Sequence, residues 1–216
     1  MARDLLTPSG TRTVPVRKPD GRLVSAQVAV EAPLEIQVGG RPLVITMRTP
    51  GHDNEVAIGF LFSEGVVNDR GQVVSVRLEP GTEQPTPEEL AAGRVGTGDR
   101  VLVELHDTTD QDSVTAAQRN FRATAACGVC GKESLADLDQ TLPSIDAVEV
   151  ALELLAQLPD RMRPHQALFE ATGGIHAAGL FTLDGELQLA REDIGRHNAV
   201  DKVIGRAVLD LSLIHI

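Results

Sequence analysis

Short stretches in the first half of the chain alternate between apolar and polar residues, which is the pattern of half-buried β-strands. Five stretches share this pattern: residues 22–30, 34–38, 42–47, 73–78 and 100–106. Only Gly39 and Gly40 separate the second stretch from the third, and a two-glycine linker of this kind predicts a tight β-hairpin. The polar segments 79–99 and 107–120 predict surface loops, the first with a short helix at 87–92.

One helical pattern interrupts these strands. Apolar residues at helical spacing follow His52 and Asp53, either of which can begin a helix, and Gly65 can end it. The first half of the chain is therefore predicted to be rich in β-structure and to contain one helix.

The second half alternates between helical and strand patterns. Asp146 and Glu149 form a capping box, which predicts a helix that runs to about Leu158. Pro159 is predicted to stop this helix, because proline lacks the backbone N–H that a helix interior needs. Residues 166–171 predict a second, short helix.

A hairpin and a final helix follow. Residues 175–183 and 186–190 are strand-like, and Asp184-Gly185 joins them. Residues 196–209 predict a helix whose apolar stripe consists of Ala199, Val200, Val203, Ile204, Ala207 and Val208. Strands mixed with covering helices predict an α/β fold.

The composition excludes several classes of function. The chain has 216 residues, of which 42% are apolar, as in globular proteins. Only 2% are aromatic, which leaves few platforms for stacking single-stranded nucleic acid. The net charge of −11 argues against binding to duplex nucleic acid, which needs a basic surface.

The same composition suggests a cellular location. No run approaches the roughly 18 apolar residues of a membrane span, and the first ten residues lack the long apolar core of a signal peptide. The chain has two cysteines, too few for the disulfide framework of a small secreted protein. We therefore expect a cytoplasmic protein with reduced thiols and with no membrane partner.

These two cysteines stand together in Cys127-Gly-Val-Cys130-Gly, between a strand-like and a helix-like segment. A thiol at a helix start lies near N–H groups that favour its thiolate. Four interpretations are open: half a zinc site, a thioredoxin-like redox pair, a persulfide-bearing sulfur carrier, and two buried structural thiols. Zinc would need further ligands such as His176 or His197, and a redox pair would need a βαβ context that is not evident here. The flanking glycines keep the sulfurs accessible, which argues against buried thiols.

A second candidate segment is Thr172-Gly-Gly-Ile-His-Ala-Ala-Gly179. Gly173 and Gly174 allow the backbone to approach a ligand closely. His176, at the start of a predicted strand, can bind a phosphate, ligate a metal or donate a proton. A loop that needs small residues for packing explains the segment equally well.

A third candidate segment, residues 191–202, leaves a strand and enters a helix, where α/β sheets tend to place ligands. An anion or nucleotide pocket could be formed by Arg191, Asp193, Arg196, His197, Asn198 and Lys202. On the predicted helix, the pairs His197/Asp201 and Asn198/Lys202 are four residues apart and share a face opposite the apolar stripe. The alternative is a solvated face with ion pairs.

Polar residues also gather where the first predicted helix begins, namely Arg48, His52, Asp53 and Glu55. The apolar face that follows is what an ordinary core helix needs, so we interpret this cluster as structural. The alternative is that His52 and Asp53 line a site or a dimer contact.

Together, four segments resemble the FdhD family (FdhD/NarQ), the formate dehydrogenase accessory sulfurtransferases. They are residues 48–65 (RTPGHDNEVAIGFLFSEG), 127–131 (CGVCG), 172–181 (TGGIHAAGLF) and 191–202 (REDIGRHNAVDK). One such segment would be moderate evidence, whereas four in this order, over about residues 46–205, are highly specific.

This resemblance implies a sulfur relay. A cysteine desulfurase gives sulfur to Cys127, which matches the persulfide-bearing position, with Cys130 as its partner. The sulfur then passes to the molybdenum of a bis-molybdopterin guanine dinucleotide cofactor, bound as substrate, before the cofactor enters formate dehydrogenase. The candidates for the cofactor pocket are Gly173, Gly174, His176, Arg191, Asp193, Arg196, His197, Asn198 and Lys202. No zinc is expected, and family members form homodimers.

The resemblance also implies a fold. The family core is similar to the cytidine deaminase fold, a sheet with helices on both faces, although the deaminase His-x-Glu motif is absent here. We expect a β-rich part over residues 11–110 and a cytidine deaminase-like part over 111–210. Family members continue well beyond the segment 191–202, so the second part is expected to be incomplete and to expose an apolar edge. Residues 211–216 look unlike the family and form an atypical tail.

Two other functions stay open. One is a zinc-binding, deaminase-like structural protein that uses Cys127, Cys130 and a histidine. The other is a non-catalytic chaperone that holds the molybdenum cofactor and docks its partners.

Overall fold

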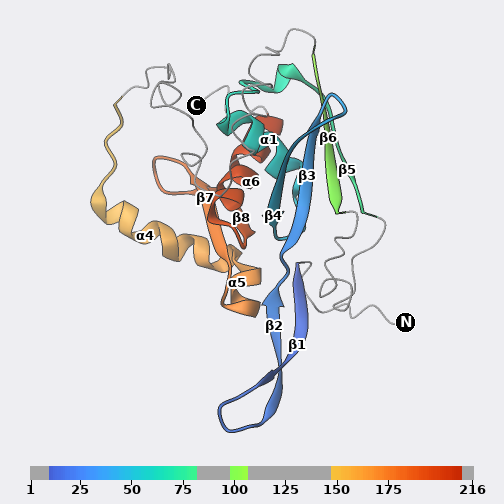
Figure 1. The fold of residues 1–216 in the computed structure, drawn as a ribbon. Helices are drawn as coiled ribbons and strands as arrows, with labels where there is room; N and C mark the ends of the chain where they lie inside the picture. Colours follow the sequence, from blue (N-terminus) through green and yellow to red (C-terminus); the bar gives the residue numbers. More distant parts are fainter. Residues whose placement is uncertain (1–9, 82–97, 107–146, 211–216) are drawn as a thin grey trace, which may run out of the picture.

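The computed structural model describes residues 10–81, 98–106 and 147–210. The strands in these ranges are β1 (Thr11–Arg17), β2 (Leu23–Ala29), β3 (Ala32–Val38), β4 (Arg41–Arg48), β5 (Val73–Glu79), β6 (Asp99–Leu105), β7 (His176–Phe181) and β8 (Leu187–Asp193). The α-helices and 3-10 helices are α1 (Asp53–Ser63), η1 (Arg70–Gln72), α4 (Leu152–Met162), η4 (Arg163–His165), α5 (Ala167–Thr172) and α6 (Arg196–Leu209). The predicted α/β class is confirmed (Figure 1). The helix predicted at 87–92 and both cysteines lie outside the described residues.

The described strands form three sheets. β1–β2 and β7–β8 are antiparallel hairpins, and the third sheet has the order β4-β3-β6-β5, with β3 and β6 parallel. The hairpin predicted at Gly39 and Gly40 is confirmed, and both residues have the positive φ that such a turn requires, 55° and 73°. The sequence pattern did not predict β1, which pairs with β2 in an arm that projects from the body (Figure 1). The cytidine deaminase-like sheet stays a prediction.

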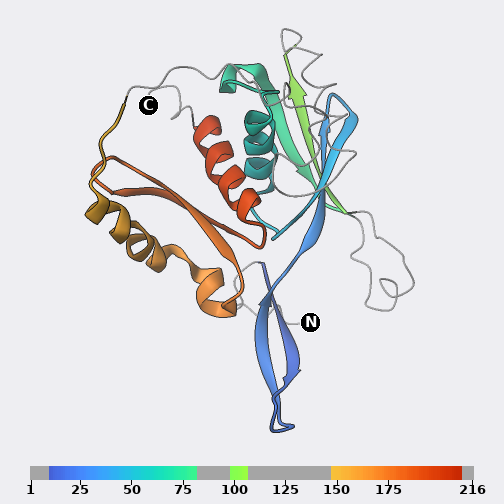
Figure 2. The ribbon, with the colours of Figure 1, turned by 60° about the vertical axis from the view of Figure 1, so that its left-hand side comes forward.

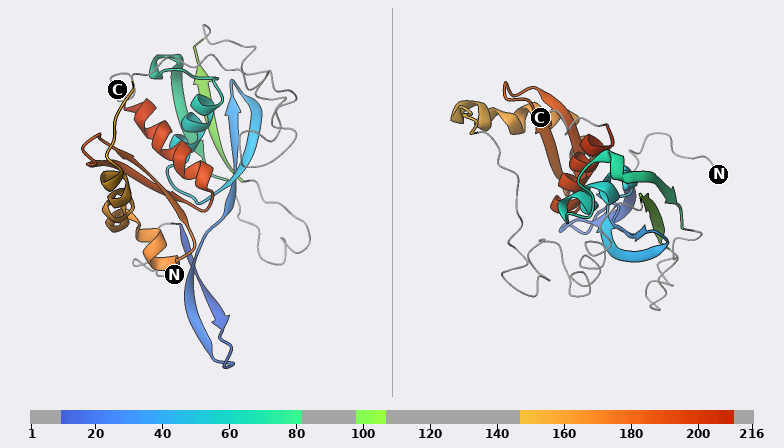
Figure 3. Two further views of the ribbon diagram at one scale, coloured as in Figure 1. Left: turned by 90° about the vertical axis from the view of Figure 1, so that its left-hand side faces the viewer. Right: turned by 90° about the horizontal axis from the view of Figure 1, so that it is seen from above.

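The elements are stacked in layers (Figure 2). The four-stranded sheet packs on α1, α1 packs on α6, and α6 packs on β7–β8, whose other face is covered by α4 (Figures 2 and 3). The main core fills the space between the four-stranded sheet and α1. Its completely buried members include Leu34, Ile36, Ile58, Leu61, Val101 and Val103. None of the described helices combines the length and the apolar composition needed to cross a membrane.

Helices α1 and α6 touch through two glycines. A Cβ atom placed on Gly59 would lie 1.9 Å from the carbonyl oxygen of Asp201, and one on Gly205 would lie 1.9 Å from that of Glu55. Both distances are far below van der Waals contact, so only glycine allows the two backbones to approach this closely. The crossing joins the first half of the chain to the second.

The predicted helix at 146–158 is wrong at both ends. Helix α4 begins at Leu152, after an extended Ala151, and continues through Pro159 to Met162. The underlying reason is packing on the β7–β8 hairpin: Leu154 comes so close to Gly185 that a Cβ there would clash with its methyl group. Tertiary contacts of this kind outweigh the local cost of an internal proline. Asp146, the proposed cap, lies outside the described residues.

Helix α6 has the predicted bounds but not the predicted faces. Ala199, Val203, Ala207 and Val208 are buried as expected, whereas Val200 is 47% exposed. Asn198 and Lys202, expected on a polar face opposite the apolar stripe, are buried as well. The reason is that α6 lies between α1 and β7–β8 and is therefore covered on two sides.

The half-buried carboxyl of Asp201 gives the α1–α6 contact a pH dependence. Its pKa is raised to about 7, mainly by burial and also by the nearby negative charges of Glu64 and Asp193. A hydrogen bond that Ser63 Oγ donates to the carboxylate at 3.1 Å acts in the opposite direction but does not outweigh them. The pKa of Asp201 is thus higher in the folded protein than in the unfolded chain, where it has the ordinary value of about 4. The protonated side chain therefore contributes its full stabilisation only below about pH 4. That contribution is lost as the pH rises through 7.

Asp201→Asn is therefore expected to be more stable than the wild type at pH 8, by up to about 4 kcal/mol. The difference should disappear near pH 4, where both side chains are neutral. Urea unfolding at the two pH values measures it, with the exposed Asp184→Asn as the matched control. A gain that is equal at both pH values would contradict this account.

Candidate functional site

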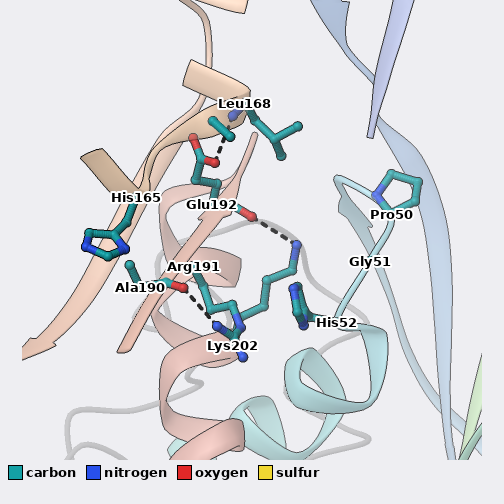
Figure 4. Close-up of a pocket in the computed structure, with 10 residues that line it drawn as sticks. Pro50, Gly51, His52, His165, Leu168, Ala190, Arg191, Glu192 and Lys202 are labelled. Carbon is teal, nitrogen blue, oxygen red and sulfur yellow. Dashed lines mark hydrogen bonds between the residues drawn. The ribbon is translucent and has the colours of Figure 1, made fainter. Parts of the chain in front are cut away.

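A pocket of about 280 Å³ lies where the loop before α1 meets α5, β8 and α6 (Figure 4). Its lining residues are Pro50, Gly51, His52, His165, Ala167, Leu168, Ala190, Arg191, Glu192 and Lys202. The pocket therefore combines residues of two of the family segments, 48–65 and 191–202, and β8 and α6 supply its Arg191 and Lys202 side chains.

Arg191 is fixed by a carboxylate from the first turn of α1. Its Nε and Nη2 donate to the two carboxylate oxygens of Glu55 at 2.6 and 2.9 Å, and its Nη1 donates to the carbonyl oxygen of Ala190. Burial would raise the pKa of Glu55, but hydrogen bonds from Arg191 and His52 outweigh it and lower the pKa to about 2. Glu55 is thus ionised and balances the charge of Arg191.

Lys202 is likewise paired inside the protein. It is 1% exposed, and its Nζ lies 2.7 Å from Oδ2 of the fully buried Asp193. The same Nζ donates to the carbonyl oxygens of Thr49 at 3.0 Å and of Glu192 at 3.1 Å. These three partners can take all three protons of the ammonium group.

Asp193 is the centre of this buried network. It accepts hydrogen bonds from the backbone N–H groups of Thr49 at 3.1 Å and Gly195 at 2.8 Å. The amide of Asn198 donates to Asp193 at 3.3 Å and to the carbonyl oxygen of Met47 at 2.7 Å. The network ties the end of β4, the end of β8 and the start of α6 together. It therefore sets the position of the pocket walls.

The predicted site residues fall into three groups. Asp193, Asn198 and Lys202 come together in the buried network just described, and Arg191 is paired separately with Glu55. The remaining described candidates lie on the surface and do not line the pocket: Gly173, Gly174, His176, Arg196 and His197. Cys127 and Cys130 lie outside the described residues.

Arg48 supports the structural interpretation of the cluster before α1. It is completely buried, its Nε lies 2.6 Å from Asp53, and its Nη2 lies 2.5 Å from Asp99. It also donates to the carbonyl oxygen of Ala32. Arg48 thus anchors the loop that carries His52 to the four-stranded sheet.

Two carboxylates have roles that the sequence did not reveal. Glu55 orients Arg191 and His52. The carboxylate of Glu192 accepts hydrogen bonds from the backbone N–H groups of Leu168 and Phe169 at the start of α5. One signal was available for Glu55: a charged residue that leads into the apolar run of α1 must be buried, and a buried charge needs a partner. The sequence offers no comparable signal for Glu192.

A metal site is not evident in the part of the chain that the structure describes. Within residues 10–81, 98–106 and 147–210, no three His, Cys, Asp or Glu side chains are grouped so that they could hold an ion. Zinc binding through Cys127 and Cys130 is a separate question, because those residues lie outside these ranges.

Comparison with known proteins adds to this geometry. A model of the FdhD/NarQ family matches residues 29–214. The chain is 44% identical to the sulfur carrier protein FdhD of Nocardia farcinica, over 94% of this chain and 66% of that protein. It is also 44% identical to the sulfur carrier protein FdhD of Streptomyces coelicolor, over 86% of this chain and 64% of that protein. The chain thus spans about two thirds of the length of these relatives.

A solved structure shows a similar fold. It comes from Desulfotalea psychrophila and is described as a formate dehydrogenase accessory protein. The TM-score is 0.60 at 24% identity, over 93% of this chain and 69% of that chain. At this identity the likeness concerns the fold alone. The match to the family model and the identity to the curated relatives carry the assignment: the chain belongs to the FdhD/NarQ family.

Proposed function

We propose that the protein is a sulfurtransferase, a sulfur carrier that serves formate dehydrogenase. The observation that carries this proposal is the 44% identity, over 94% of the chain, to a curated protein named sulfur carrier protein FdhD. The pair Cys127 and Cys130 supplies thiols suited to that role. Because the chain spans about two thirds of its relatives, the activity of the whole protein enters here as a proposal.

The loading step is an exchange of sulfur between two cysteines. The thiolate of Cys127 attacks the outer sulfur of a persulfide on a cysteine desulfurase, R–S–SH. A new S–S bond forms at Cys127, the S–S bond of the donor breaks, and the donor cysteine leaves as its thiolate. The product is a Cys127 persulfide, and Cys130 assists or resolves it.

The acceptor in this proposal is a bis-molybdopterin guanine dinucleotide molybdenum cofactor, bound as substrate. Its anionic groups call for hydrogen-bond donors and a backbone that can approach closely. The surface residues Gly173, Gly174, His176, Arg196 and His197 are candidates for direct contact. In this proposal Arg191, Asp193, Asn198 and Lys202, already paired with one another or with neighbours, hold the site in shape. We further propose that the protein acts in the cytoplasm as a homodimer.

Cys127→Ala is expected to abolish sulfur loading. The protein is incubated with a cysteine desulfurase and cysteine, and the mass gain of one sulfur is measured on the intact chain. The wild type should gain the sulfur, and Cys127→Ala should gain none. Cys130→Ala loses one thiol of the same segment but keeps Cys127, so it should still gain the sulfur. Loading of Cys127→Ala at the wild-type level would assign the acceptor to another residue.

The two alternatives predict different results. A zinc protein would contain stoichiometric zinc that is lost when both cysteines are replaced. A cofactor chaperone without sulfur chemistry would still activate formate dehydrogenase as Cys127→Ala in cells that lack the native protein. A loss of activation together with a loss of loading supports the sulfur carrier over both.

A further inference from the structure

The β1–β2 arm is a two-stranded ribbon whose root packs on α5 (Figure 1). Its distal half ends in the turn between Lys18 and Arg22 and lies clear of every other described helix and strand (Figure 2). A two-stranded ribbon on its own has only marginal stability in water, and a third strand is a usual means of stabilising it. An added strand would therefore stabilise the distal half of the arm.

The hydrogen bonds at the two ends of the ribbon define which backbone groups point outward. The N–H of Lys18 donates to the carbonyl oxygen of Arg22 at 2.9 Å, and the N–H of Val30 donates to that of Gly10 at 2.8 Å. Inward and outward backbone groups alternate along an antiparallel strand. With the observed register, the even-numbered residues of both strands therefore bond to each other, and the backbone groups of the odd-numbered residues point outward.

The two outer edges of the arm differ in what they can bind. On β1, one of the outward positions is Pro15, which has no N–H and so blocks the pairing of a further strand. On β2, the outward positions of the distal half are Leu23, Ser25 and Gln27, and no described strand pairs with them. The outer edge of β2 is therefore open to a third strand, whereas that of β1 is not.

The arm is positively charged on an otherwise acidic chain. Residues 10–30 contain four cations and one carboxylate, Asp20, so their net charge is +3, against −11 for the whole chain. The cations are Arg12, Arg17, Lys18 and Arg22. Asp20 pairs with Arg22 at 3.7 Å, and no described carboxylate pairs with the other three. Unlike Arg191 and Lys202, which are neutralised inside the protein, these cations can pair with an acidic partner.

One face of the ribbon is aliphatic between these cations. Its members are Val14, Val16, Val24, Ala26 and Val28. Val16 and Val28 are each 39% exposed, with Arg12 near the root of the face and Lys18 at its tip. Aliphatic side chains of a strand added to β2 would extend this face, and carboxylates at the ends of that strand would meet the cations.

We propose that the outer edge of β2 binds an extended acidic segment of a partner protein, which joins the arm as a third strand. The segment has aliphatic residues in alternate positions at its centre and carboxylates at its ends. Backbone hydrogen bonds to β2 hold the segment, and the charges of the arm select it against basic segments. This surface shares no residue with the pocket, and the inference does not depend on the sulfur-carrier proposal.

The probe is a synthetic peptide of about nine residues that alternates valine with threonine and carries two glutamates at each end. Its binding to the purified full chain is followed by NMR at neutral pH. The amide signals of Leu23, Ser25 and Gln27 should shift, and their N–H groups should exchange with solvent about tenfold more slowly, because they donate to the peptide. The same peptide with lysines in place of the glutamates should bind about tenfold or more weakly.

Two pairs of variants separate the edge from the charges. Ser25→Pro removes an outward N–H of β2, as Pro15 does on β1, and should abolish binding, whereas Ser25→Ala should leave it unchanged. Lys18→Glu/Arg22→Glu should weaken binding of the glutamate peptide about tenfold, whereas Arg77→Glu, at an exposed cation of β5, should not. If Ser25→Pro melts at a lower temperature than the wild type, the charge variants in the exposed turn decide the result.

Three results would overturn the proposal: absence of peptide binding, equal binding of the two peptides, or signal shifts confined to residues outside the arm. Sedimentation of the chain without peptide tests a second copy as the occupant. Dimers that Ser25→Pro converts into monomers would assign the β2 edge to that second copy and overturn the acidic partner. The same oligomeric state in Ser25→Pro and the wild type supports the proposal.

Discussion

Gly205→Ala is expected to destabilise the protein by about 3 kcal/mol. An alanine in the interior of a helix normally stabilises it relative to glycine by about 0.5–1 kcal/mol. Here the added methyl group would lie 1.9 Å from the carbonyl oxygen of Glu55, on the backbone of α1, which cannot move aside as a flexible side chain can. Helices α1 and α6 must then separate, and the core beneath them loosens.

Urea unfolding followed by circular dichroism measures this change in the free energy of unfolding. Gly59→Ala, on the other side of the crossing, should have a similar effect, because its methyl group would meet the backbone of Asp201 at 1.9 Å. Gly174→Ala is the control, since the nearest atom to its methyl group would be 3.9 Å away. Stabilisation by Gly205→Ala would mean that the two helices do not touch in solution.

Lys202→Met is expected to destabilise the protein by about 3–5 kcal/mol. The change removes the cation that pairs with Asp193, which is 0% exposed, and leaves that carboxylate buried without its charge partner. A solvated face of α6, which the sequence left open, would instead lose only about 0.3–0.5 kcal/mol per ion pair. The size of the loss in unfolding free energy therefore distinguishes a buried network from an ion pair on the surface.

Chemical unfolding of three variants tests this prediction. The double variant Lys202→Met/Asp193→Asn should recover part of the lost stability, because it no longer buries a charge. Arg77→Met is the matched control, since the pair of Arg77 with Glu79 is exposed and should contribute less than about 1 kcal/mol. An equal effect of Lys202→Met and Arg77→Met would refute the buried network.

The elements predicted correctly from the sequence are those that short-range signals define. The hairpin at Gly39-Gly40 follows from its turn residues, and helix α6 follows from a long run of helical spacing. The bounds of α4 were predicted wrongly because they depend on long-range contacts. Its continuation through Pro159 depends on packing against β7–β8, which no local pattern around Pro159 encodes. Strand β1 was missed because its burial is slight and it relies on pairing with β2.

The candidate site shows the same division. The sequence analysis singled out the segment of Arg191 and Lys202 for its polar side chains and interpreted the cluster around His52 as structural, but it did not reveal the partners of these residues. Glu55 and Arg191 are 136 residues apart, and a pattern along one segment cannot indicate which distant carboxylate neutralises a cation. For this reason a run that suggests an exposed anion pocket turns out to hold internally paired charges. His52, which the sequence analysis interpreted as structural, lines the pocket together with His165.

The contact between α1 and α6 also has a consequence for biosynthesis. The hydrogen bond from Ser63 to Asp201 joins residues that are 138 positions apart in the sequence. During synthesis, α1 can therefore pack on α6 only after α6 has been made. A nascent chain that has produced the four-stranded sheet and α1 still exposes the face of α1 that α6 will cover. Contacts this distant in sequence slow folding and leave apolar surface open to aggregation meanwhile. The contact between α1 and α6 can therefore form only after residues 196–209 have been made.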